Sequence, residues 1–159
     1  MEQLSKPTVF ILDVDGVMTT GQFLYGPEGK AYKVFGPHDA DGLKLLKGKI
    51  DIKFISADKR GFPITQKRIS EDMGYPLELV SEAERHAYVE KHGFENVIFM
   101  GDGYFDAKVM KHCAFAIAPK NARKEARDVA HFVTESNSAE GAVMDACLEV
   151  AKRYFDEEQ

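Results

Sequence analysis

The chain of 159 residues has no tryptophan and only two cysteines, and it lacks any apolar run near the ~20 residues that cross a bilayer. Cys113 and Cys147 stand in apolar-patterned segments without a CxxC spacing, so we expect buried free thiols rather than a disulfide or a metal site. Residues 1–6 show no signal-peptide core. We therefore expect a cytoplasmic protein with no membrane segment.

An excess of positive charge is also missing. The chain has 21 Lys and Arg against 26 Asp and Glu, a net charge of -5, and nucleic-acid phosphates require a basic surface. We therefore expect no nucleic-acid partner. The 44% hydrophobic and 30% charged content is ordinary for a globular protein, and this length can bury a core without disulfide or metal crosslinks. We expect a single domain over residues 1–159.

The most informative stretch is residues 9–17. Four apolar residues, 9 to 12, predict a strand buried on both faces of a sheet, and Asp13, Asp15 and Gly16 follow it. Aspartate is unfavourable in a strand and costly to bury unpaired. Carboxyl ends of parallel strands border the ligand crevice of an open sheet, so these acids are candidates to hold a cation or attack a substrate. A strand followed by a simple Asp-Gly turn is the alternative.

The remaining pattern alternates strands and helices. Further strands are expected at 50–55, 77–80, 96–100, 115–117 and 131–133, and helices at 43–47, 63–73, 81–92, after Asp102 to about 112, 119–128 and 141–155. This order predicts an α/β fold with a parallel sheet. Two short aromatic runs flank the turn at 26–29 and predict a β-hairpin at about 22–35. A hairpin is marginal alone, so it should pack on its own body or on another subunit.

Polar residues end several of the predicted strands. Ser56 closes the second strand of the sheet, and Asp102 and Asp106, spaced i and i+4, follow a later one. Carboxylates from separate strand ends make an all-oxygen site, which suits Mg²⁺ and not zinc. One carboxylate can attack a phosphate, a second can exchange protons, and a hydroxyl with a cationic side chain can hold the phosphoryl oxygens.

Three motifs carry a family resemblance. They are Asp13-Val14-Asp15-Gly16, Ser56 within Phe54-Ile55-Ser56-Ala57, and Gly101-Asp102-Gly103-Tyr104-Phe105-Asp106. In order and strand context, over about residues 8–135, the chain resembles the haloacid dehalogenase superfamily of phosphatases. The resemblance is closest to the capless branch with 3-deoxy-D-manno-octulosonate 8-phosphate and nonulosonate 9-phosphate phosphatases, on DVDGV, the hairpin and residues 35–42. It implies a Rossmann-like three-layer parallel sheet with a β-hairpin insertion and no cap domain.

The same resemblance implies roles for individual residues. Asp13 would be the nucleophile and Asp15 the general acid and base, and Mg²⁺ would be held by Asp13, Asp102 and the backbone carbonyl of Asp15. Ser56 and Ala57 would bind the phosphate, and Asp106 would support the site. The substrate would be a small sugar phosphate, a 3-deoxy-2-ulosonate phosphate. The hairpins would assemble a homotetramer in which a neighbouring subunit helps to close each active site.

The chain departs from the family pattern at three places. The usual third-motif lysine is missing, and Arg85 is the best-placed cation, although it could equally be a solvent-facing helix residue. Asp58 stands where the octulosonate enzymes have arginine, and it would repel a sugar-acid carboxylate unless Lys59 or Arg60 compensates. This favours a nonulosonate over an octulosonate phosphate. The stretch 138–141 lacks the usual carboxylate-binding arginine.

One further residue and two rival functions complete the expectations. His38 follows the hairpin near the expected mouth of the site and is a candidate substrate contact. The first rival is a non-catalytic oligomerisation module of the same fold, as in some sialic-acid activating enzymes, but such a module would not need the full acid set. The second is a phosphoacceptor receiver domain, which lacks a general acid two residues after the nucleophile and the GDxxxD element.

Overall fold

The computed structural model describes residues 6–155, so both ends of the expected 1–159 domain lie outside the described range. Six parallel strands form the central sheet in the order β5-β4-β1-β6-β7-β8. They are β1 (Val9–Asp13), β4 (Asp51–Ser56), β5 (Leu77–Leu79), β6 (Val97–Met100), β7 (Phe115–Ala118) and β8 (Phe132–Val133). The predicted parallel α/β sheet is confirmed, with the Asp13 strand near its centre.

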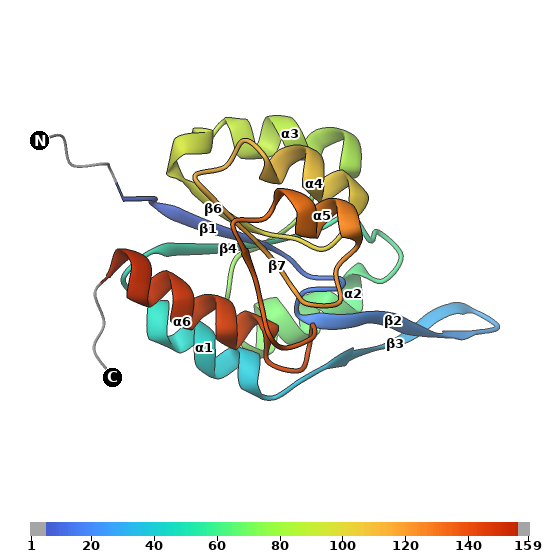
Figure 1. The fold of residues 1–159 in the computed structure, drawn as a ribbon. Coiled ribbons are helices and arrows are strands. Elements are labelled where there is room, and N and C mark those ends of the chain that lie inside the picture. The colour runs from blue at the N-terminus through green and yellow to red at the C-terminus, as the bar shows by residue number, and fades with distance from the viewer. Residues whose placement is uncertain (1–5, 156–159) are drawn as a thin grey trace, which may run out of the picture.

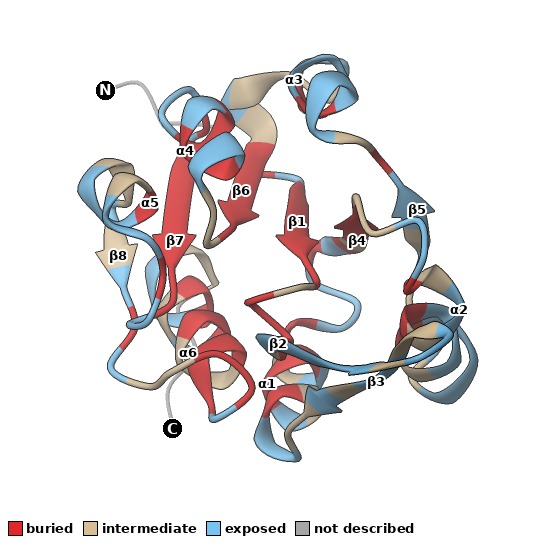
Figure 2. Cartoon of the chain, turned by 90° about the vertical axis from the view of Figure 1, so that its right-hand side faces the viewer, coloured by how far each residue is buried: buried red, intermediate tan, exposed pale blue. Residues whose placement is uncertain are grey.

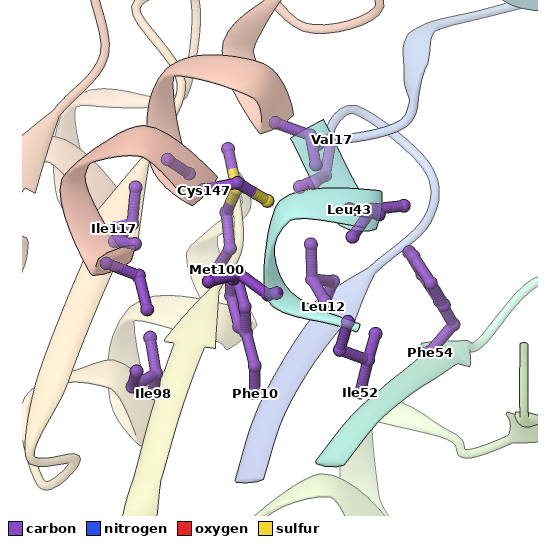
Figure 3. Packing of buried hydrophobic residues seen from close by; sticks show 14 of the residues in the cluster. Phe10, Leu12, Val17, Leu43, Ile52, Phe54, Ile98, Met100, Ile117 and Cys147 are labelled. Carbon is purple, nitrogen blue, oxygen red and sulfur yellow. The ribbon is translucent and has the colours of Figure 1, made fainter. Parts of the chain in front are cut away.

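Helices cover both faces of the sheet (Figure 1). One face carries α1 (His38–Leu46) and α6 (Ala142–Tyr154), and the other carries α3 (Glu82–Glu90), α4 (Tyr104–Met110) and α5 (Lys124–Val129). Side chains of β1 pack against the helices on both faces of the sheet, because successive side chains of a strand point to opposite faces. Phe10 and Leu12 enter the core under α1 and α6, where Figure 3 shows them with Leu43 and Cys147. Val9 and Ile11 enter the core on the other face.

The predicted hairpin forms from β2 (Thr19–Gly26) and β3 (Gly29–Phe35), which pair antiparallel as a separate two-stranded sheet. Gly29 closes the turn with a φ of 112°, a conformation that favours glycine. Figure 2 shows the hairpin beside the carboxyl ends of the buried strands, with mostly exposed residues of its own. The predicted hairpin insertion is thereby confirmed among residues 6–155.

Three helices differ from their predicted bounds. The first begins at His38 rather than residue 43, because Pro37 precedes it and Asp39 and Asp41 favour a helix N-terminus. The helix expected at 63–73 is α2 (Phe62–Thr65) followed by a π-helix, η1 (Gln66–Asp72). The helix expected at 119–128 begins only at Lys124. The backbone N–H groups of Lys120 and Arg123 instead donate to residues in other loops.

Other local expectations are met. Ser81 caps α3 in a capping box with Glu84, and a short 3-10 helix, η2 (Phe94–Asn96), leads into β6. Cys113 and Cys147 are buried free thiols, as predicted. Among the described helices, none has the length and apolar character that crossing a bilayer requires.

Candidate active site

A cleft of about 390 Å³ opens at the carboxyl ends of the central strands. Its walls come from the end of β1, the loop after β4, the first turns of α3 and α4, and the hairpin. Asp13, Asp15, Ala57, Arg85 and Asp102 line this cleft, as does Asp106. The topology therefore brings together most of the residues that the motifs singled out from distant parts of the chain.

Three carboxylates meet at the bottom of the cleft. Asp13, Asp102 and Asp106 each offer an oxygen, and the three oxygens lie within 4.8 Å of one another. Close approach of the backbone makes this possible: a Cβ on Gly16, whose φ is +82°, would lie 1.8 Å from Asp102 Oδ2. An all-carboxylate donor set of this size fits a hard dication such as Mg²⁺. Asp106 thus belongs to the acid cluster itself, whereas the Asp15 carboxylate points elsewhere.

Burial and mutual repulsion make this cluster electrostatically unfavourable without a cation. Burial, together with the nearby charge of Asp106, raises the pKa of Asp13 well above its usual value. The same two causes, in the same order, raise the pKa of Asp102 to about 7. Both shifts express the cost of crowding like charges away from water. A bound cation would offset that cost.

Arg85 reaches the cleft from α3. Its Nη1 donates to Asp106 Oδ1 at 2.7 Å, and its side chain is only 6% exposed, so the solvent-facing alternative for this arginine is wrong. Its buried Nε has no hydrogen-bond partner among the described residues. The other Asp106 oxygen accepts from the backbone N–H groups of Asp102 and Gly103. Arg85 therefore both charges the cleft and fixes Asp106 at the start of α4.

Asp15 is held from the other side. Lys33 Nζ donates to its Oδ1 at 2.7 Å, and Ser56 Oγ donates to its Oδ2 at 3.0 Å. Ser56 is fully buried at the end of β4, and its Oγ also accepts from the backbone N–H of Asp58. The motifs did not predict Lys33. A signal was present in the alternation of β3, where Lys33 lies between the exposed Tyr32 and Val34 and so must face the protein.

The charge of Asp58 is compensated, but not by the residues predicted. Lys30 and Lys33, both from the hairpin, bind its two carboxylate oxygens at 2.8 and 2.9 Å. Burial alone would raise the pKa of Asp58, but the hydrogen bonds from Lys30 and Lys33 outweigh it and lower the pKa to about 2. Lys59 is exposed and does not line the cleft. The local chain turns the Asp58 carboxylate toward the hairpin and Gly61.

His38 is also absent from the cleft. His38 is the exposed first residue of α1 and does not line the cleft. The neighbouring Asp39 has a structural role instead. Asp39 is buried and accepts from the backbone N–H groups of Val143 and Met144 at the start of α6. The mouth of the cleft is instead lined by Phe23 from β2 and by Tyr104 and Phe105 from α4.

Known proteins are similar to this chain in sequence and in fold. Residues 84–146 match the family of haloacid dehalogenase-like hydrolases. The 3-deoxy-D-manno-octulosonate 8-phosphate phosphatase of Haemophilus influenzae is 28% identical over 147 residues, which are 89% of this chain and 81% of that protein. The crystal structure of the Moraxella catarrhalis phosphatase of the same name, with magnesium, phosphate and KDO, has a TM-score of 0.77 and 25% identity over 92% of this chain and 86% of that one.

A probable phosphatase from Pseudomonas syringae aligns with a TM-score of 0.81 and 25% identity, over 92% of this chain and 85% of that one. The family match includes Arg85, Asp102 and Asp106, and the longer alignments extend the likeness over nearly the whole chain. The resemblance predicted from the motifs is thereby confirmed: the chain is similar to haloacid dehalogenase-like hydrolases and to named phosphatases, which supports a phosphatase activity.

Proposed function

We propose that the protein is a Mg²⁺-dependent phosphomonoesterase that acts on a small sugar phosphate through a phosphorylated Asp13. The observation that carries this proposal is the convergence of Asp13, Asp102 and Asp106 within 4.8 Å in a cleft that Asp15 also lines. The complete acid set supports catalysis over the alternative of a non-catalytic module. The buried free thiols are in keeping with a reducing cytoplasm as its location.

The cation would be held by the carboxylates of Asp13, Asp102 and Asp106, with the backbone carbonyl of Asp15 as the ligand implied by the family resemblance. When bound, Mg²⁺ supplies positive charge against the phosphate dianion and the surrounding acids. Arg85 adds a second positive charge at the wall of the cleft, which would attract a phosphate.

Two carboxylates divide the chemistry between them. An Asp13 oxygen attacks phosphorus, the bond from phosphorus to the sugar oxygen breaks, and Asp15 gives its proton to the leaving oxygen. Asp15 then takes a proton from water as the water oxygen attacks the phosphorylated Asp13. The bond from phosphorus to Asp13 breaks, which releases phosphate and restores both groups.

A 3-deoxy-2-ulosonate phosphate, of an octulosonate or a nonulosonate, is the substrate class that we propose. The named phosphatases to which the chain is similar support it. Neutralisation of Asp58 by Lys30 and Lys33 removes the main electrostatic objection to a sugar acid in this cleft. The half-exposed rings of Phe23, Tyr104 and Phe105 offer apolar surface to the carbon face of a sugar.

The experiment is a phosphate-release screen over sugar phosphates, including the 8- and 9-phosphates of these acids, with Mg²⁺ and with EDTA. We expect activity with Mg²⁺ only, and its loss in Asp13→Asn. Full turnover in EDTA would remove the metal from the proposal, and full activity of Asp13→Asn would remove the nucleophile. Release from neutral sugar phosphates with none from the sugar acids would overturn the substrate class alone.

We also propose a homotetramer assembled through the outer face of the hairpin. Leu24 and Tyr32 are cross-strand partners there and are 61% and 66% exposed, and Val34 extends the apolar surface. Exposed apolar patches of this kind mark association surfaces. Light scattering of Leu24→Asp/Tyr32→Asp should give monomers where the unaltered protein gives tetramers. A tetrameric double variant would refute this assembly.

A further inference from the structure

The side chain of Lys33, at the edge of the cleft, is buried with only 1% exposure. Its ammonium group has three partners: Asp15 Oδ1 at 2.7 Å, Asp58 Oδ2 at 2.9 Å and Thr65 Oγ1 at 2.9 Å. The contacts with Asp15 and Thr65 are hydrogen bonds, and the contact with Asp58 is an ion pair. Burying a lysine this deeply is costly unless it is paired, which indicates a specific task for the charge.

The buried charge of Lys33 holds the carboxylate of Asp15 in place. Lys33 holds Asp15 Oδ1 while Ser56 holds Oδ2, so both oxygens of this half-exposed carboxylate are fixed from the protein side. Neither contact comes from the Asp13, Asp102 and Asp106 cluster. The orientation of Asp15 therefore depends on β4, through Ser56, and on the hairpin, through Lys33.

We propose that Lys33 is a positioning residue, which places the carboxylate of Asp15 for proton transfer to and from the substrate. This inference rests on the proposed role of Asp15 as general acid and base. Lys33 itself does not touch the substrate, and it is not among the residues that line the cleft. It acts through a charge-assisted hydrogen bond, which is shorter and stronger than a neutral one.

The surrounding packing leaves little freedom for a different arrangement. A Cβ added to Gly61 would lie 2.2 Å from Asp58 Oδ2 and 2.8 Å from Lys33 Cε, so the chain before α2 packs directly against this ion pair. Thr65, whose Oγ1 accepts a hydrogen bond from Lys33, is fully buried in α2. The ammonium is therefore clamped from the α2 side while it reaches Asp15 from the hairpin side.

A purely structural role is the competing explanation, because Lys33 also neutralises Asp58. Lys30, Lys33, Asp15 and Asp58 together carry no net charge, and removing Lys33 alone would leave one uncompensated carboxylate. Removing Asp58 as well restores the balance. The double variant Lys33→Met/Asp58→Asn therefore separates the two explanations: it repairs the charge but leaves Asp15 without its donor.

The test measures kcat and KM for Lys33→Met, Lys33→Met/Asp58→Asn, Asp58→Asn and Lys30→Met, with the sugar phosphate that the unaltered protein hydrolyses fastest. Lys30→Met is the matched comparison, since it removes a lysine from the same hairpin and from the same Asp58 but has no contact with Asp15. Thermal unfolding with and without Mg²⁺ checks that each variant folds and binds the ion.

We expect kcat to fall at least about tenfold in both Lys33 variants, with KM changed less than about threefold, because small displacements of a catalytic group cost this much or more. Lys30 and Asp58 line the cleft, so Lys30→Met and Asp58→Asn should act mainly on KM and lose much less kcat than the Lys33 variants. Recovery of kcat in the double variant, or an equal loss in Lys30→Met, would overturn the proposal. Activity of the unaltered protein is measured first. If it releases no phosphate from any substrate, the proposed function fails, and this outcome is distinct from failure of the role proposed for Lys33.

Discussion

Removing the metal ion should make this protein more stable in mild acid than in mild base. Burial and mutual repulsion raise the pKa of Asp13 and bring that of Asp102 to about 7, against 3.8 for an ordinary aspartate. Between those values the folded chain holds a proton that the unfolded chain has already lost. Linkage therefore requires the free energy of unfolding to rise as the pH falls from 7 toward 4, the reverse of ordinary acid denaturation.

The magnitude follows from the shift of Asp102. Inside the window, one carboxyl changes stability by at most ~1.4 kcal/mol per pH unit. Because Asp102 is only half protonated at pH 7, the change between pH 7 and pH 5 is roughly 2 kcal/mol. In a chain of this size ~1 kcal/mol moves the unfolding temperature by ~2–4 °C, which predicts a gain of roughly 4–8 °C. Because a cation needs deprotonated ligands, stabilisation by Mg²⁺ should be larger at pH 8 than at pH 5.5.

Calorimetry of EDTA-treated protein at pH 8, 7, 6 and 5.5, with and without Mg²⁺, measures both effects. Asp102→Asn is the control, because it keeps the shape of the side chain and removes the titrating group. Its unfolding temperature should depend less on pH and on Mg²⁺, and the five histidines affect both proteins alike. Two results would refute the reasoning. One is an unfolding temperature of the metal-free protein that depends on pH in the same way as that of Asp102→Asn. The other is an equal stabilisation of both proteins by Mg²⁺.

Three substitutions test other parts of the structure. Asp39→Ala removes the acceptor for two N–H groups at the start of α6 and should lower the free energy of unfolding in urea by ~1–2 kcal/mol, whereas Asp39→Asn keeps an acceptor oxygen and should cost less. Gly16→Ala drives a Cβ into the Asp102 carboxylate, so calorimetric titration should show Mg²⁺ binding at least tenfold weaker, and binding like that of the unaltered protein would count against the cluster as the ion site. Arg85→Met leaves Asp106 buried without its ion-pair partner, so it should lower the free energy of unfolding by ~3 kcal/mol and also lower kcat/KM. Arg85→Lys should retain part of the stability and part of the activity. An unchanged kcat/KM in Arg85→Met would leave Arg85 with a structural role only.

Local pattern was sufficient for the sheet and for the acid cluster. The apolar runs at residues 9–12 and 97–100 both form fully buried strands, and acids directly after such strands lie at the carboxyl edge of a parallel sheet. Asp13 and Asp102 could therefore be brought together from sequence alone. The side chain of Asp106 could be assigned to the same helix start, but not its direct place beside Asp13, which depends on Arg85 and the turn at 101–103.

The failures lie where a contact is made between elements far apart in the chain. Lys59 and Arg60 were natural partners for Asp58 because they are its neighbours in sequence, yet hairpin residues some 25 positions earlier hold it. No local periodicity predicts how a hairpin lies beside the carboxyl ends of the sheet. The prediction that His38 contacts the substrate was wrong for a related reason. His38 follows the hairpin in sequence, but α1 begins at this residue and leaves its side chain exposed and away from the cleft.

The two faces of β3 therefore have separate physical tasks, and alternation along the strand keeps them apart. Lys33 points toward the protein and holds Asp15, whereas its neighbours Tyr32 and Val34 point outward and leave apolar surface exposed. Substitution of Tyr32 should thus alter assembly while the Asp15 contact survives, and substitution of Lys33 should do the reverse. Deleting the whole hairpin removes both at once. Loss of activity after such a deletion would therefore say nothing about whether assembly is needed for catalysis, and only single-face variants can separate the two.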